Sequence, residues 1–263
     1  MISSTSNKQV KYVGTLLKKA KARQEEGLFV AEGLRMCMEI PPERIRALYI
    51  SESFRKTPHC GSLVQHVPQV EVLSDPVFAA LSDTRTPQGV LALVEQRHSC
   101  LEELVSADPG GPVPHLLVLE HLQDPGNLGT ILRAGEGAGL TGILMDKGTA
   151  DVYNPKVVRA TMGSLLRVPF AYVEDLGAAL ALLKKNGIRI YAAHLQGSRD
   201  YDQEDYRGAT AFLVGNEANG LSQEAASAAD ARIRIPMLGR VESLNAAVAA
   251  SVLMFEAARQ RRR

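Results

Sequence analysis

Three short segments in the second half of the chain combine residue types that could bind a ligand and act on it. They run Asn127–Arg133, Gly215–Gly220, and Ile235–Met237 continued by Glu242–Asn245. Each follows an apolar run typical of a strand, and two of them open into an apolar helix. Small residues at strand ends let backbone amides approach a ligand closely. The three segments therefore predict a ligand site at the ends of strands.

Two charged side chains give this predicted site its chemistry. Arg133 is permanently cationic and matches a phosphate or a developing oxyanion. Its neighbours in sequence are apolar, and since unpaired burial of a charge is costly, we expect Arg133 to have a partner or a ligand. Glu217 lies between Gly215 and Gly220. A simple turn would explain the two glycines but gives no reason for the carboxylate.

Asn245 stands at the start of an apolar helix expected over residues 243–259. Ser243 or Glu242 is the expected cap, and a helix N-terminus favours anions and carboxylates. Small residues at almost every position of this helix predict close packing against another backbone. That backbone could belong to a second subunit or to the protein's own core, and both alternatives stay open.

Glycines at Gly135, Gly137 and Gly139 resemble a dinucleotide-binding fingerprint but do not complete it. The fingerprint needs G-x-G-x-x-G between a strand and a helix, whereas the third position here is Leu140 and the segment ends a helix. The glycine pattern therefore lacks the dinucleotide site that a nucleotide-dependent oxidoreductase needs.

Apolar periodicity divides the chain into two α/β parts. Strands are expected at residues 28–31, 45–50, 70–73 and 90–94, and then at 115–119, 142–145, 167–171, 188–192, 211–215 and 232–235. Short apolar strands separated by helices predict, for the second part, a mostly parallel sheet covered on both faces. Proline and glycine crowd residues 102–114 and exclude a helix or strand there. We predict domains at 1–105 and 115–263, joined by a linker at 106–114.

Composition limits the class of protein. A hydrophobic content of 45% over 263 residues supports a full core. No apolar stretch approaches the ~18 residues that a membrane span needs, and no signal-peptide core is present, so a cytoplasmic protein without a membrane partner is expected. The 3 cysteines and 6 histidines lack metal-ligand spacing, and we expect neither disulfides nor a metal.

Positive charge gathers at the N-terminus. Residues 1–24 contain lysines and one arginine but no acidic residue, and Lys11, Lys18, Lys19 and Arg23 recur at helical spacing. Clustered basic residues are typical of phosphate binding. A solvated helix face is the plain alternative.

Taken together, the three segments resemble the signature motifs of the SpoU/TrmH branch of the SPOUT RNA methyltransferases. Residues 28–33 and 86–90 resemble the family's N-terminal substrate-binding domain of the L30e type. The resemblance implies a C-terminal, mostly parallel sheet with a trefoil knot, preceded by a smaller α/β domain. It also implies a homodimer, S-adenosylmethionine as methyl donor, and 2′-O-methylation of a ribose in RNA.

The resemblance also assigns roles to single residues. It implies catalytic roles for Arg133, Asn127, Glu217 and Asn245. The implied cofactor-binding residues are Leu195, Gly215, Asn216, Gly220, Ile235, Met237, Ser243 and Leu244. One departure is that the family continues Ser-Leu-Asn-Val-Ser, whereas this chain has alanines at 246 and 247, so a hydroxyl role at 247 is absent.

Three functions remain after this comparison. The expected one is 2′-O-methylation of RNA, with 23S rRNA as substrate because an extra N-terminal α/β domain favours rRNA. The alternatives are a tRNA 2′-O-methyltransferase and a non-catalytic RNA-binding protein. The last would keep the basic residues but would have no need for Arg133, Glu217 and Asn245 together.

Overall fold

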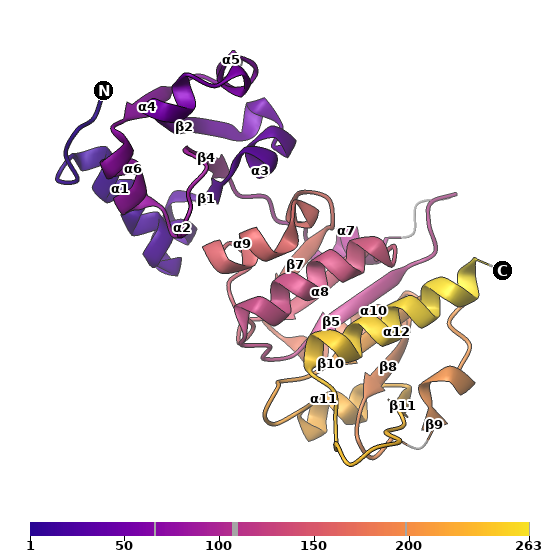
Figure 1. Cartoon of the computed structure of the whole chain (residues 1–263). Coiled ribbons are helices and arrows are strands. Elements are labelled where there is room, and N and C mark those ends of the chain that lie inside the picture. The colour runs from indigo at the N-terminus through magenta and orange to yellow at the C-terminus, as the bar shows by residue number, and fades with distance from the viewer. Residues whose placement is uncertain (66, 107–109, 198, 263) are drawn as a thin grey trace. The chain divides into compact units, whose positions relative to one another are not determined.

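The computed structural model describes residues 1–65, 67–106, 110–197 and 199–262 (Figure 1). The chain forms two compact units: residues 1–97 with 151–163, and residues 98–150 with 164–263. Residues 98–105 thus belong with the second unit and 151–163 with the first, whereas the domains predicted from the sequence were 1–105 and 115–263. Part of the predicted linker, residues 107–109, lies outside the described residues.

The first unit is built on a four-stranded sheet with the order β1-β4-β2-β3. Its strands are β1 (Leu28–Glu32), β2 (Ile45–Ser51), β3 (Val70–Leu73) and β4 (Val90–Glu95), and only β2 and β3 pair in parallel. Its helices are α1 (Lys8–Lys18), α2 (Ala20–Glu26), α3 (Leu34–Glu39), α4 (Glu52–Arg55), α5 (Pro58–Val64), α6 (Asp75–Leu81) and α9 (Pro155–Thr161). Buried side chains of α1, α6 and the sheet, among them Val13, Phe78 and Leu91, form one core. The predicted small α/β domain is present.

Arg23 has a structural role in this unit. The helix predicted through residue 23 breaks at Lys19, which is extended (φ −119°, ψ 113°), and Arg23 lies in the separate helix α2, where it is only 3% exposed. Its guanidinium donates to the Leu16 carbonyl at 2.7 Å and to the Asp151 carboxylate at 2.5 and 2.9 Å. The expectation that Arg23 faces RNA is therefore wrong, because a buried, paired cation cannot contact a phosphate without breaking this pair.

The second unit is built on a seven-stranded sheet with the order β7-β6-β5-β10-β8-β11-β9. The strands are β5 (His115–Leu119), β6 (Gly142–Asp146), β7 (Phe170–Val173), β8 (Arg189–Ala193), β9 (Arg199–Asp200), β10 (Thr210–Val214) and β11 (Ala231–Arg234). Every neighbouring pair runs parallel, which confirms the predicted fold class. β7 begins three residues later than predicted, because the N–H groups of Arg167 and Val168 donate to the Ser164 carbonyl and continue the turn that starts at 164–166.

Helices cover both faces of this sheet. α7 (Leu101–Val105), α10 (Leu176–Lys185) and α11 (Gln223–Ala228) pack into a core with side chains from β5, β6, β8 and β10. α8 (Pro125–Gly137) and α12 (Ala246–Arg261) lie side by side on the sheet (Figure 1). The exclusion of a helix from residues 102–114 is wrong for α7, whose residues precede the prolines and bury Leu104 and Val105.

The strand order brings distant segments together. β10 pairs with β5 in register, Val214 opposite Leu119, although about a hundred residues separate them in sequence. β6 pairs with the other side of β5, so the chain changes direction across the sheet at this strand. Ligands of open parallel sheets bind at such a switch point, beyond the carboxyl ends of the strands.

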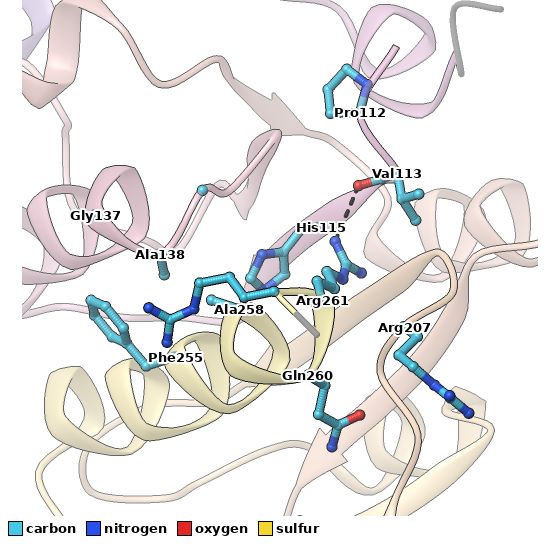
Figure 2. A pocket seen from close by; sticks show the side chains of 12 residues that line it. Pro112, Val113, His115, Gly137, Ala138, Arg207, Phe255, Ala258, Gln260 and Arg261 are labelled. Carbon is cyan, nitrogen blue, oxygen red and sulfur yellow. Dashed lines mark hydrogen bonds between the residues drawn. The ribbon is translucent and has the colours of Figure 1, made fainter. Parts of the chain in front are cut away.

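A cavity of about 550 Å³ lies at the opposite, N-terminal end of β5 (Figure 2). Arg261 of α12 donates to the carbonyls of Val113, Pro114 and Gly208 at 2.7–3.1 Å and so attaches the end of α12 to the start of the strand. His115 lines the same cavity, is 1% exposed, and has no partner for Nε2 among the described residues. Burial, reinforced by the charge of Arg261, lowers the pKa of His115 to about 4.

We predict that His115 makes the fold sensitive to mild acid. The unfolded chain protonates this imidazole near pH 6.5, whereas the folded chain keeps it neutral down to about pH 4. The contribution of neutral His115 to the free energy of unfolding is therefore complete above pH 6.5. It is lost as the pH falls towards 4, by about 3 kcal/mol at most. Urea unfolding between pH 7 and pH 4.5 should show a smaller decline for His115→Gln than for the wild type. Parallel declines would contradict a neutral buried His115.

Candidate functional site

The predicted segments meet at the carboxyl edge of the seven-stranded sheet. A cavity of about 1060 Å³ opens there, between the ends of β8, β10 and β11 and the start of α12. All the residues predicted to bind a cofactor line it: Leu195, Gly215, Asn216, Gly220, Ile235, Met237, Ser243 and Leu244. Glu217 and Asn245 also line it, whereas Asn127 and Arg133 do not. The cofactor-binding roles of these residues remain predictions.

The Glu217 carboxylate joins the second segment to the first. Oε1 accepts hydrogen bonds from Asn127 Nδ2 at 3.0 Å and from the backbone N–H of Asp124 at 3.1 Å, and Oε2 accepts from Gln123 N–H at 3.2 Å. Partial burial acts to raise the pKa of Glu217, but these hydrogen bonds outweigh it and lower the pKa below its ordinary value. Glu217 is therefore an ionised acceptor that positions the loop before α8.

Asn127 and Asn245 extend this connection to the third segment. Asn245 Nδ2 donates to Asn127 Oδ1 at 2.9 Å, while Asn245 Oδ1 accepts from the backbone N–H groups of Ala247 and Val248 at 2.9 and 3.3 Å. The cap of α12 is thus Asn245, and the expectation of Ser243 or Glu242 is wrong. Glu217, Asn127 and Asn245 form one hydrogen-bonded chain, and each comes from a different segment.

The glycines of the second segment are required by its tight turn. A Cβ on Gly215 would lie 2.3 Å from the carbonyl carbon of Gly220, and Gly220 itself has a φ of +67°. Asn216 and Gly220 exchange two backbone hydrogen bonds, at 2.9 and 3.0 Å. No larger residue fits at position 215, so these glycines shape the cavity wall, and Glu217 projects from the turn to hold Asn127.

Arg133 lies apart from this network. Its side chain is exposed on α8, and within the described residues it has neither a hydrogen bond nor an ion pair. The expectation of a partner is therefore not met inside the chain, and the desolvation argument fails because the side chain is not buried. Six residues separate it from Asn127, about 9 Å along the helix axis. Its guanidinium is free to bind an anion from outside.

The surface around Arg133 continues onto α12. Gly137, one turn further along α8, would contact the Phe255 ring at 3.5 Å if it carried a Cβ. Phe255 and Val248 are 46% and 48% exposed, while the small residues Ala247, Ala250 and Ala257 are buried. The alanines thus serve close packing within the chain, and α12 also presents an uncovered apolar stripe, which we call the α12 stripe (Val248 and Phe255).

Residues that sequence reasoning missed also shape the site. Asp124 Oδ1 caps α8 by accepting from Asn127 N–H at 2.7 Å, and the Asp-Pro pair at 124–125 is a recognisable helix-start signal. Buried Glu120 accepts from both Ser222 N–H and Oγ, at 2.8 and 2.7 Å. No signal in the sequence connects residues 120 and 222, since only the β5–β10 pairing brings them together.

Neither a metal centre nor a membrane span is found in the described part of the chain. No group of three or more His, Cys, Asp or Glu side chains there could hold a metal ion. No helix among these residues is both long and apolar enough to cross a membrane.

Comparison with known proteins identifies the family. A model described as the SpoU rRNA Methylase family matches residues 114–255, and one described as an MRM3-like substrate binding domain matches residues 7–92. The 23S rRNA (guanosine(2553)-2′-O)-methyltransferase RlmP of Bacillus subtilis is 31% identical, over 97% of each chain. The 23S rRNA (guanosine-2′-O-)-methyltransferase RlmB of Shewanella oneidensis is 29% identical, over 91% of this chain and 99% of its own.

Solved structures agree with these relatives. The AdoMet-bound rRNA methyltransferase from Sinorhizobium meliloti superposes with a TM-score of 0.86 and is 32% identical, covering 98% of this chain and 97% of that one. The SpoU methyltransferase AviRb from Streptomyces viridochromogenes, in complex with AdoMet, gives 0.86 at 27% identity over 97% and 98%. The chain belongs to the SpoU rRNA methylase family.

Proposed function

We propose that this protein transfers a methyl group from S-adenosylmethionine to the 2′-hydroxyl of a ribose in 23S rRNA. The observation that carries the proposal is the hydrogen-bonded chain of Glu217, Asn127 and Asn245 at the cavity where the predicted cofactor residues gather. Relatives named as 23S rRNA 2′-O-methyltransferases support the substrate, and AdoMet-bound structures of similar proteins support the donor. A tRNA substrate remains the second candidate within the same chemistry.

The cavity suits S-adenosylmethionine in both size and lining. Its volume of about 1060 Å³ is ample for a ligand of this size. Leu195 stands 65% exposed at its wall, and Ile235, Met237 and Leu244 are half-buried, which leaves apolar surface for an adenine ring. The Gly215–Gly220 turn offers backbone polar groups for the ribose and the amino-acid moiety. When bound, the cofactor supplies an activated methyl group.

The chain's own residues divide the remaining work. Glu217 holds Asn127, and Asn127 holds Asn245, so the polar groups beside the cavity are positioned before a substrate arrives. Arg133 makes a poor base, because a guanidinium keeps its proton in proteins. It stabilises the developing ribose alkoxide and the adjacent phosphate by its charge.

A homodimer would complete this arrangement. Arg133 does not line the cavity of its own chain, and its exposed face of α8 adjoins the α12 stripe through Gly137 and Phe255. A second copy that covers the stripe buries exposed apolar surface and brings Arg133 near a neighbouring molecule's surface. In a homodimer Arg133 would therefore lie near a second subunit, whereas in an isolated chain it points only into solvent.

The cofactor site can be tested by calorimetry. S-adenosylmethionine should bind at one site per chain, and Gly215→Ala should abolish binding because the added Cβ meets the Gly220 backbone at 2.3 Å. Gly208→Ala is the matched control, since a Cβ there has nothing within 4 Å. If Gly215→Ala bound S-adenosylmethionine with wild-type affinity, the cofactor site would have to lie elsewhere. Failure of the wild type to bind either the donor or its demethylated product would refute the proposed chemistry.

Arg133 can be tested by turnover. Arg133→Ala should lower methyl transfer by about 100-fold or more, the scale of losing a preorganised charge stabiliser, without changing cofactor affinity. Arg133→Lys should also be slow, since an ammonium does not reproduce the planar guanidinium. Thr130→Ala, one turn earlier on the same exposed face, serves as control. Turnover of Arg133→Ala within a few-fold of wild type, with sedimentation showing an unchanged assembly, would exclude a role in the reaction.

The basic N-terminal segment can be tested by RNA binding. Lys8, Lys11, Lys18 and Lys19 are exposed, and none has an ion-pair partner within the described residues. Changing all four to Gln should weaken RNA binding and flatten its salt dependence, because fewer counterions are released. Lys21→Gln is the control, since Lys21 already pairs with Glu25 at 3.7 Å. An unchanged salt slope in the quadruple variant would make these lysines a solvated face only.

A further inference from the structure

His121, in the loop between β5 and α8, has an unusual backbone. Its φ is +55°, and among the described non-glycine residues only Met162 also has a positive φ. Such a conformation is strained for an L residue and persists only where surrounding contacts enforce it. Here the His121 N–H donates to Asp146 Oδ1 at 2.9 Å, and the His121 carbonyl accepts from Asn216 Nδ2 at 2.7 Å. The backbone is held from two neighbouring strand ends.

Contacts also fix the position of the imidazole ring. Nδ1 lies against Asp146 Oδ2, and Asp146 is 6% exposed and also accepts from Thr149 Oγ1 at 2.8 Å. The ring fills the space above Gly148, where a Cβ would come within 2.4 Å of it. One carboxylate thus binds both the backbone and the ring of His121. This contact fixes the orientation of the ring.

The contact with Asp146 also decides which nitrogen is available. A neutral imidazole that donates Nδ1–H to a carboxylate carries its lone pair on Nε2. Within the described part of the chain Nε2 has no partner, and the side chain is 61% exposed. The paired carboxylate stabilises the imidazolium that forms when Nε2 takes up a proton. The geometry is that of an oriented base facing solvent.

His121 belongs to the loop that builds the candidate site. Two residues further on, the N–H groups of Gln123 and Asp124 hold the Glu217 carboxylate. The His121 carbonyl holds Asn216, which precedes Glu217. His121 is therefore connected to the second segment through one direct hydrogen bond, and to Asn127 through its own loop.

The other groups at the site are poorly suited to accept a proton. Arg133 is a permanent cation, Asn127 and Asn245 are amides, and the pKa of Glu217 is lowered by its three hydrogen bonds. His194 lines the cavity, but its Nδ1 accepts from Gln196 N–H at 3.1 Å. In the neutral ring the proton of His194 is then on Nε2, which leaves no free basic nitrogen.

We propose that His121 Nε2 accepts the proton released during methyl transfer, with Asp146 as its positioning residue. The inference rests on the proposed function. The ribose 2′-oxygen forms a bond to the methyl carbon, and the carbon–sulfur bond breaks with its electron pair left on the sulfur of S-adenosylmethionine. The hydroxyl proton passes to Nε2, and solvent later removes it. Charge is balanced, since one sulfonium cation is replaced by one imidazolium.

Asp146 is the charged group in contact with this ring, and further charged side chains lie on the neighbouring loops. Asp146 contacts it from the end of β6, and the next residue, Lys147, is paired with Glu174. Glu217 projects from the loop after β10, and Asp124 lies in the loop of His121 itself. Glu120 accepts two hydrogen bonds from Ser222. A general base acts only in its unprotonated form, so the rate should rise with pH until Nε2 is free.

The test is the pH dependence of single-turnover methyl transfer to rRNA, with cofactor and RNA saturating. His121→Asn keeps a residue type that tolerates positive φ but has no basic nitrogen. We expect its rate to fall about 100-fold or more and its profile to lose the inflection seen in the wild type. In His121→Gly, added imidazole should restore part of the rate. His59→Asn, an exposed histidine of the first unit, is the control.

A readout independent of activity follows the ring directly. 15N NMR should show the neutral ring of His121 protonated on Nδ1, and Asp146→Asn should weaken this tautomer preference because the accepting carboxylate is gone. A rate within threefold of wild type in His121→Asn, or an unchanged inflection, would overturn the proposal. Weaker RNA binding with the inflection intact would make His121 an RNA contact instead. A wild-type protein that binds S-adenosylmethionine and RNA but leaves every ribose unmethylated would refute the proposed function itself.

Discussion

The Glu217 carboxylate is the contact on which the geometry of the candidate site depends. It accepts three hydrogen bonds, two from backbone N–H groups of the loop before α8 and one from the Asn127 side chain in the first turn of α8. Without it those donors would lose their acceptor, and Asn127 would lose the group that orients its amide. Asn127 in turn positions Asn245, and Asn245 caps α12. One ionised side chain therefore couples two loops and the start of the longest helix, and it can do so because its pKa is held low.

The sheet positions the residues of this contact but contributes almost no polar side chains itself. β5, β6 and β10 are buried along their whole length, as strands covered by helices on both faces must be. Chemistry is thereby confined to the strand ends. The pairing of β5 with β10 places residue 119 beside residue 214, and side chains about a hundred residues apart become neighbours. The same pairing explains the Glu120–Ser222 contact and the link from Asn216 to His121.

Strong local patterns were predictable from the sequence, and long-range contacts were not. Runs of apolar residues identified the strands, and the second and third segments identified the cavity wall. The exposure of Arg133 was missed because sequence neighbours are not helix neighbours: Ile131, Leu132 and Gly135 face the core, while Thr130 and Arg133 face outward. Arg23 was misjudged because its partner, Asp151, lies 128 residues away. The grouping of residues 151–163 with the first unit depends on contacts of the same kind.

Polar and apolar groups play opposite parts around the cavity. The polar side chains are already satisfied by one another, so a ligand need not reorganise them. Apolar side chains are left uncovered: Leu195, which lines the cavity, is 65% exposed, and Leu238 and Val241, in the segment that leads to Asn245, are 101% and 61% exposed. Covering apolar surface contributes roughly 25 cal/mol per Å². Binding energy is therefore available from the loops after β8 and β11. The polar geometry is held by Glu217 and Asn127, which follow β10 and β5, and Asn245 joins it from the segment after β11.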